Sequence, residues 1–301
     1  MVRHTVTAIV LASVTLLGLG GAAVSAPLAK EIVVKRIELT LVDESRPTPA
    51  NGTFAGTPDR TLETVVSMPK GASKKKPLPL IVFATGIGGT ATNYADMYDH
   101  WVRAGYIVAA PTFPLSSEDA PGGTSAVDLT EQPADLSFVL DEVLRLNDEK
   151  GSGLTGLIDA DRIGLAGKSL GAVTVIDLFF KAESHDDRFK ALLVLTGIGR
   201  GDFAAYPIPI LLVHGDADEI VPVSGSVDIY TAAQPPKHFV TVYGASHSSA
   251  FHGEDDPASS VVVQTAIDFF DLYLKGKKAA LARLERDGNV ADVAAIDSTT
   301  P

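Results

Sequence analysis

The 301-residue chain carries 37 acidic and 25 basic residues, a formal net charge of −12, and no cysteine. The acidic balance argues against nucleic acid or an anionic membrane surface as the partner, because both attract Lys and Arg. The lack of cysteine excludes disulfides, zinc–thiolate sites and a cysteine nucleophile. Since 46 % of the residues are apolar, the chain can form the large core of a single α/β domain.

The N-terminal residues have the pattern of an export signal. An apolar run from Thr7 to Leu19 is followed by small residues, and Val24-Ser25-Ala26 resembles a signal-peptidase site. Cleavage after Ala23 is the alternative, because a proline follows the first site. The run is too short to span a bilayer comfortably. We therefore expect residues 1–26 to be a signal peptide, residues 27–301 to form one domain without a membrane span, and the protein to be secreted or periplasmic.

The rest of the chain predicts alternating strands and helices. Short apolar runs typical of buried strands are separated by segments with helical periodicity. Strands are expected at Glu31–Leu41, Thr61–Met68, Leu80–Phe83, Tyr106–Ala110, Arg162–Ala166, Ala191–Leu195, Ile208–Val213 and Phe239–Tyr243. Helices are expected around Asn93–Arg103, Pro133–Leu144, Leu170–Phe180, Ser224–Ala233 and Pro257–Leu274. This alternation predicts a mostly parallel central sheet with helices on both faces, which binds ligands beyond the carboxyl ends of its strands.

A G-x-S-x-G motif follows one of these strands and opens a helix. It consists of Gly167, Ser169 and Gly171. A serine on such a sharp strand-to-helix turn is pushed out above the sheet, and the glycines avoid the clashes that side chains would cause there. The alternative is a glycine-rich turn with a structural role only. The apolar strand before the motif and the apolar helix after it favour Ser169 as a nucleophile.

An acidic loop follows the strand that ends at His214-Gly215. A serine nucleophile needs a histidine to accept its proton, and that histidine needs a carboxylate to fix its tautomer. The loop offers Asp216, Asp218 and Glu219 for this role. The alternative is that all three are solvated loop charges or cap a helix.

The candidate base is His247, which follows the last expected strand after a turn of small residues. The order Ser, Asp, His along the chain is typical of the serine hydrolases built on this kind of sheet. His252 lies five residues further on and is the competing histidine.

A glycine-rich loop, Gly86-Ile87-Gly88-Gly89, follows the first central strand. Acyl transfer builds negative charge on the carbonyl oxygen, which two backbone N–H groups can stabilise. We expect these oxyanion donors to be the amides of Leu170, directly after the nucleophile, and of Ile87. A phosphate-binding loop is the rival interpretation, but the G-K-[ST] sequence that such a loop requires does not follow.

With these motifs the chain resembles bacterial α/β-hydrolases related to dienelactone hydrolase and platelet-activating-factor acetylhydrolase, and the cutinase-like esterases. The resemblance also includes residues 43–48 and the segment 158–163 before the nucleophile. It implies Asp218 as the acid, three residues after the glycine of His-Gly, and Ile87 as the second oxyanion donor. Two positions depart from the family pattern, Thr85 and Lys168, where members usually carry histidine. Neither departure removes a residue of the expected Ser–His–Asp triad, but both affect which substrate we expect the site to accept.

The expected function is hydrolysis of carboxylic esters through an acyl-enzyme, without metal or cofactor. The substrate is expected to be a small or polymeric ester with a short chain or an exposed ester bond. Lipase, polyester depolymerase, thioesterase and amidase activities are alternatives, as is a non-enzymatic binding protein that retained the fold. We expect no large lid domain, because only about a dozen residues, Thr196–Pro207, separate two strands where a lid would be inserted. The polar segment Pro114–Pro133 is expected to form a rim. The sequence does not indicate an oligomeric state.

Overall fold

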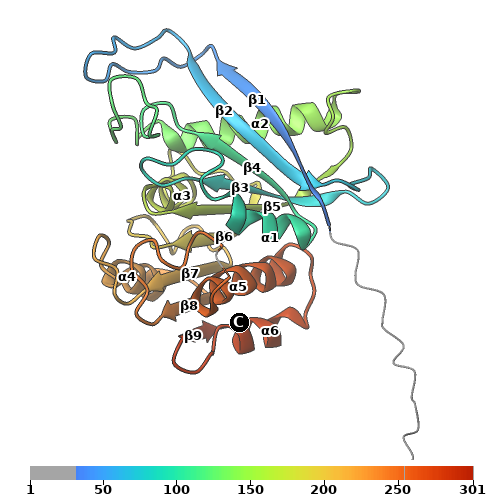
Figure 1. Cartoon of the computed structure of the whole chain (residues 1–301), viewed down its shortest axis with the longest axis vertical. Helices are drawn as coiled ribbons and strands as arrows, with labels where there is room; N and C mark the ends of the chain where they lie inside the picture. Colours follow the sequence, from blue (N-terminus) through green and yellow to red (C-terminus); the bar gives the residue numbers. More distant parts are fainter. Residues whose placement is uncertain (1–31, 254, 301) are drawn as a thin grey trace, which may run out of the picture. The chain divides into compact units, whose positions relative to one another are not determined.

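The computed structural model describes residues 32–253 and 255–300, so the expected signal peptide at residues 1–26 lies outside the described residues. The elements in chain order are β1 (Val34–Asp43), β2 (Arg60–Pro69), β3 (Leu78–Ala84), α1 (Ala95–Arg103), β4 (Ile107–Thr112), α2 (Gln132–Asp148), β5 (Ile158–Lys168), α3 (Leu170–Phe180), β6 (Phe189–Leu195), β7 (Ile210–Gly215), α4 (Ser224–Ala232), β8 (Lys237–Val242), α5 (Pro257–Tyr273), α6 (Ala280–Asp287) and β9 (Ala294–Thr299) (Figure 1). In this part of the chain no helix has the length and hydrophobicity needed to cross a membrane.

All nine strands form one sheet in the order β1-β2-β4-β3-β5-β6-β7-β8-β9. Neighbouring strands from β4 to β8 pair in parallel. The pairs β1–β2, β2–β4 and β8–β9 are antiparallel. The expected mostly parallel sheet is therefore confirmed, with antiparallel strands added at both edges.

Helices cover both faces of this sheet because its central strands are apolar on both sides. In β3, Leu80 and Val82 belong to the core cluster that includes residues of α2, α3 and α4, whereas Ile81 and Phe83 belong to the cluster that includes residues of α1, α5 and α6. The alternation follows from the two-residue period of a strand. Figure 1 shows the two helix layers on either side of the sheet.

Two elements were not expected from the sequence. Helix α6 and strand β9 form the C-terminal part of the fold, and β9 pairs with β8 along its whole length. The sequence of β9 is Ala-Ala-Ile-Asp-Ser-Thr, with Ile296 as its one large apolar residue. An edge strand with one solvated face needs few apolar residues, so its composition does not distinguish it from a loop.

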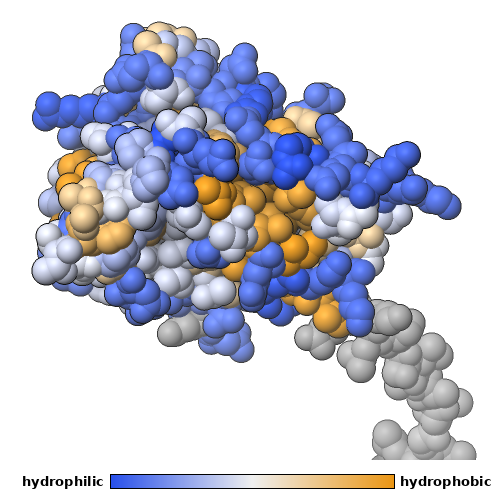
Figure 2. Space-filling view, turned by 90° about the horizontal axis from the view of Figure 1, so that it is seen from above, coloured by the Kyte–Doolittle hydropathy of each residue, from blue (hydrophilic) through white to orange (hydrophobic). Residues whose placement is uncertain are grey.

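The opposite edge of the sheet is β1. Seen from this end of the molecule, hydrophilic side chains surround an apolar stretch of surface (Figure 2). The β1 side chains Ile37 and Leu39 pack against the core and remain partly exposed.

Candidate active site

Ser169 forms the turn between β5 and α3 and has φ 57° and ψ −117°. This backbone conformation is unfavourable for a residue with a side chain, at a cost of about 1–3 kcal/mol, and such strain is common at functional sites. The flanking glycines make the turn possible. A β-carbon on Gly167 would lie 2.2 Å from the carbonyl oxygen of Gly171, and one on Gly171 would lie 2.2 Å from that of Ala84. The G-x-S-x-G pattern thus has a steric cause here.

The structure brings Ser169, His247 and Asp218 together from three loops that follow β5, β8 and β7. The distance from Ser169 Oγ to His247 Nε2 is 2.8 Å, and that from His247 Nδ1 to Asp218 Oδ2 is also 2.8 Å. An ionised carboxylate can only accept, so Nδ1 carries the proton and donates to it. Nε2 is then free to accept the hydroxyl proton of Ser169, which is the arrangement of a serine nucleophile and its base.

Asp218 is held in its ionised form by several donors. Its Oδ1 accepts hydrogen bonds from the backbone amides of Val221 (2.8 Å) and Ile220 (2.9 Å). Burial alone would raise the pKa of Asp218, but the hydrogen bonds from Val221, His247 and Ile220 bring it below its ordinary value. The carboxylate therefore remains charged beside the imidazole.

The two competing carboxylates have other contacts. Asp216 Oδ1 accepts from the backbone amide of Gly244 at 2.6 Å. Glu219 Oε2 accepts from the backbone amide of His247 at 3.2 Å, so it contacts the main chain and not the ring. The competing histidine, His252, stacks on the ring of Tyr94. Of these three groups, none is hydrogen-bonded to Ser169 Oγ or to the His247 ring.

His214, which no sequence motif assigns to the site, lies beside the acid. Its Nε2 is 2.9 Å from the carbonyl oxygen of Val221 and 3.2 Å from Asp218 Oδ2. Burial lowers the pKa of His214. Because its Nε2 faces only oxygen acceptors, this nitrogen carries a proton and donates to the acid loop. A histidine that ends an otherwise apolar strand is the sequence feature that could have revealed this supporting role.

The two expected oxyanion donors flank the nucleophile. Among the described residues, the amides of Ile87 and Leu170 donate to no backbone acceptor. Leu170 is the first residue of α3, where helical amides lack an intrahelical partner. Ile87 follows Gly86, and a β-carbon on Gly86 would lie 3.2 Å from Ser169 Cβ. The backbone of this loop therefore passes directly beside the serine.

The glycine-rich loop at residues 86–89 is held by contacts at both of its ends. Thr85 is buried, and its hydroxyl lies 3.4 Å from the carbonyl oxygen of Gly89. The Gly88 amide donates to the carbonyl of Ser116 in the long β4–α2 connection at 2.6 Å. These contacts fix the backbone of the loop, and the expected role of the Ile87 amide as an oxyanion donor needs a backbone fixed in this way.

A buried polar network fixes the β4–α2 connection in turn. Gln132 donates to Ser116 Oγ at 3.0 Å and accepts from Thr174 Oγ1 of α3 at 2.6 Å. Arg60, which is fully buried, donates to Asp128 at 2.9 Å and twice to Asp135 at 2.6 Å. No local sequence pattern indicates this network, because its members are spread over more than a hundred residues.

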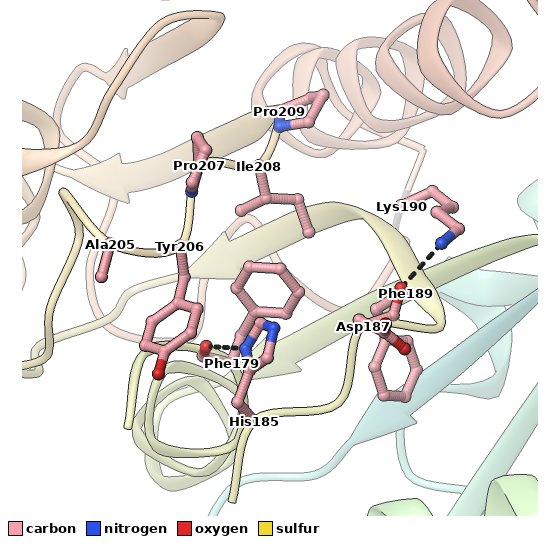
Figure 3. A pocket seen from close by; sticks show the side chains of 10 residues that line it. All are labelled: Phe179, His185, Asp187, Phe189, Lys190, Ala205, Tyr206, Pro207, Ile208 and Pro209. Carbon is pink, nitrogen blue, oxygen red and sulfur yellow. Dashed lines mark hydrogen bonds between the residues drawn. The ribbon is translucent and has the colours of Figure 1, made fainter. Parts of the chain in front are cut away.

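Other hollows lie away from the triad. One of about 380 Å³ is lined by Phe179, His185, Tyr206 and their neighbours around the amino end of β6 (Figure 3). Serine 169 lies beyond the carboxyl end of β5, which runs parallel to β6, so this hollow is at the opposite end of the strands. It is not part of the candidate active site.

Comparison with solved structures identifies the fold. The ferulic acid esterase from Streptomyces cinnamoneus aligns with a TM-score of 0.64 over 84 % of this chain and 93 % of its own, at 20 % sequence identity. The chain has the α/β-hydrolase fold. Neither the β6–β7 connection nor the β4–α2 connection of this hydrolase fold contains a helix, so the described residues include no lid domain there.

Sequence comparisons give more limited matches. No family model matches the chain. The uncharacterized protein YfhR of Escherichia coli K12 is 24 % identical over 134 residues, 37 % of this chain and 46 % of YfhR. YfhR of Salmonella typhi is 34 % identical over 68 residues, 23 % of this chain and 21 % of its own length. The chain thus matches less than half the length of these curated relatives.

Proposed function

We propose that this protein is a serine hydrolase that cleaves carboxylic esters through an acyl-enzyme. The observation that carries the proposal is the pair of 2.8 Å contacts that links Ser169 through His247 to Asp218. The ferulic acid esterase with the same fold supports ester hydrolysis as the reaction. The N-terminal pattern described above supports a secreted or periplasmic location.

The geometry supports a two-step reaction. His247 Nε2 takes the Ser169 proton while Oγ bonds to the ester carbonyl carbon, and the Ile87 and Leu170 amides stabilise the resulting oxyanion. The intermediate collapses when the C–O bond to the alcohol breaks and the alcohol takes the proton from Nε2. Water then attacks the acyl carbon while His247 Nε2 takes its proton. The acyl–Oγ bond breaks, Nε2 returns the proton to Ser169 Oγ, and the acid is released.

Covalent labelling tests the proposal directly. A fluorophosphonate probe should label the full chain at one residue, and peptide mass spectrometry should place the label on Ser169. The same preparation should hydrolyse p-nitrophenyl acetate and should leave the matched p-nitroanilide largely intact. Heat-denatured protein is the control for reactivity that does not need the fold. A folded protein that takes no label would be a binding protein, and preferential anilide cleavage would make it an amidase.

The open site predicts a preference for short acyl chains. Each methylene adds about 0.8 kcal/mol, roughly four-fold in kcat/KM, only while an apolar wall buries it. The apolar side chains of the neighbouring loops are themselves half exposed, 48 % for Ile198 and 65 % for Ile220. We expect kcat/KM for p-nitrophenyl esters to rise from acetyl to about butyryl and then to level off. A continued rise to palmitoyl, or a jump in rate above the solubility limit, would show instead that the enzyme is a lipase.

A further inference from the structure

Tyr94 lies at the N-terminus of α1, shortly after the glycine-rich loop at residues 86–89. Its ring packs edge-on against Phe83 of β3, with 5.4 Å between the ring centroids. It also stacks on the ring of His252, at 5.5 Å between the centroids. Only 6 % of Tyr94 is exposed. This packing fixes the ring, so its hydroxyl has little freedom to move.

The hydroxyl of Tyr94 lies beside the nucleophile. A β-carbon on Gly86 would lie 3.3 Å from Tyr94 Oη and 3.2 Å from Ser169 Cβ, so the two side chains approach the same point. Gly86 directly precedes Ile87, whose amide is an expected oxyanion donor. Tyr94 Oη therefore lies next to the atoms that are expected to stabilise the oxyanion.

The hydroxyl proton of Tyr94 has no acceptor among the described residues of the protein. In contrast, the neighbouring Tyr98 donates to the carbonyl of Ala91, and a tyrosine hydroxyl on a buried ring usually has such a partner. Tyr94 Oη is also not one of the fully buried polar atoms without a partner, so the small exposed part of the residue includes this oxygen. A substrate bound at Ser169 can therefore reach it.

The hydroxyl of Tyr94 has the properties of a donor to a developing negative charge. Burial raises the pKa of Tyr94, and the Gly86 amide, which lies beside the hydroxyl, opposes this effect. The hydroxyl is therefore protonated in neutral solution. A neutral donor that packing holds in place stabilises charge that forms during the reaction without first having to reorganise. The ester carbonyl oxygen gains that charge when Ser169 Oγ bonds to the carbonyl carbon.

We propose that Tyr94 is a third oxyanion donor, whose hydroxyl donates a hydrogen bond to the former carbonyl oxygen of the ester together with the Ile87 and Leu170 amides. This role rests on the proposed function, since the oxyanion forms only if Ser169 attacks an acyl group. The proton stays on Tyr94 throughout, so no bond of the tyrosine breaks. The role also explains why a buried tyrosine leaves its hydroxyl unpaired at the nucleophile.

Tyr94→Phe removes the hydroxyl and keeps the ring on Phe83 and His252. We expect kcat for p-nitrophenyl acetate to fall by about 10²-fold, the lower end of the loss that removal of one oxyanion donor causes. KM should change by less than about two-fold, since the hydrogen bond is made in the transition state and not with bound substrate. The melting temperature should stay within about 1 °C of the wild type, because the hydroxyl donates to no protein group.

Tyr98→Phe is the matched control from the same aromatic cluster. It leaves the buried Ala91 carbonyl without its donor, so the melting temperature should fall by about 2–4 °C. Its kcat should equal that of the wild type, because the hydroxyl of Tyr98 bonds to Ala91 and not to a substrate. The two variants thus separate a catalytic effect from a structural one.

A butyl trifluoromethyl ketone probes the same hydrogen bond without turnover, because Ser169 adds to its carbonyl and forms a stable oxyanion. Its inhibition constant should rise in Tyr94→Phe by about the factor by which kcat/KM falls. The corresponding alcohol has no carbonyl, so its inhibition constant should not change. A purely structural role of the hydroxyl would move both inhibition constants together or neither of them.

The rate of fluorophosphonate labelling separates this role from the proposed function, because the phosphoryl oxygen takes the place of the oxyanion. A wild type that is labelled at Ser169 but cleaves no ester would overturn ester hydrolysis. Slower labelling of Tyr94→Phe would then still support the third donor, and equal labelling would overturn it. A wild type that takes no label would overturn both. In an active enzyme, an unchanged kcat and ketone affinity in Tyr94→Phe, or a loss confined to KM or melting temperature, would exclude Tyr94 as a donor.

Discussion

Replacement of Ser169 by alanine should lower kcat for ester hydrolysis by roughly four to six orders of magnitude, as the loss of a triad nucleophile does elsewhere. The change removes the atom that bonds to the carbonyl carbon and leaves the Cβ in place. Because the strained turn is held by the close approach of Gly167 and Gly171 to neighbouring backbone, the variant should keep its fold. Stopped assays at high enzyme concentration would measure kcat, and thermal unfolding would show whether the variant keeps its fold.

The matched control is Ser248→Ala, an exposed serine next to the candidate base. Its side chain has no part in the Ser169–His247–Asp218 contacts, so the variant should retain nearly all activity. If Ser169→Ala kept as much as a tenth of the wild-type rate, another nucleophile would have to carry the reaction.

The second large effect is expected for Asp218→Asn, with a loss of about 10⁴ in kcat, the cost seen for the equivalent change in serine proteases. The asparagine amide can donate to His247 Nδ1, which would place the ring proton on Nε2. A protonated Nε2 cannot accept the hydroxyl proton of Ser169, although the shape of the site is unchanged.

Asp216→Asn is the comparison that distinguishes the two acids. The carbonyl oxygen of an asparagine can still accept the hydrogen bond from the Gly244 amide, so the loss should be less than about ten-fold, since only a peripheral contact is altered. Steady-state kinetics of both variants at one pH would suffice. A larger loss in Asp216→Asn than in Asp218→Asn would reverse the assignment of the acid.

The core of the fold could be predicted because its strands and helices carry strong local patterns. The runs around Ile81, Leu193 and Leu211 are apolar on both faces, and α3 begins and ends where its sequence predicts. The C-terminal α6 and β9 could not be predicted in this way. Strand β9 depends on pairing with β8, and α6 lies against α5; the composition of these short segments does not reveal either tertiary contact.

The sequence predicts which residues form the candidate site, but it does not predict how their side chains contact one another. The sequence places Asp216 and Asp218 two residues apart in the same loop, with no local feature that says which one faces His247. The structure separates them because the Asp216 amide bonds to the Val242 carbonyl, continuing the β7–β8 pairing, and its side chain turns to Gly244. Likewise, the sequence shows that Lys168 is unusual, but its burial is known only once the strands are assembled.

The β4–α2 connection contains buried residues held by hydrogen bonds and exposed residues between them. The two groups differ in how well they should tolerate substitution. Ser116 bonds to the glycine-rich loop through the Gly88 amide, and Gln132 bonds to Thr174 of the helix after the nucleophile. Asp128 accepts from the Leu115 amide and from Arg60 of β2. Between Ser116 and Asp128, residues 118–127 are mostly exposed, and Asn51 secures their backbone through the carbonyls of Pro121 and Gly123. The sequence predicts this segment as the rim of the site, so we expect libraries in residues 118–127 to alter substrate range without exchanging the buried residues that hold the connection in place.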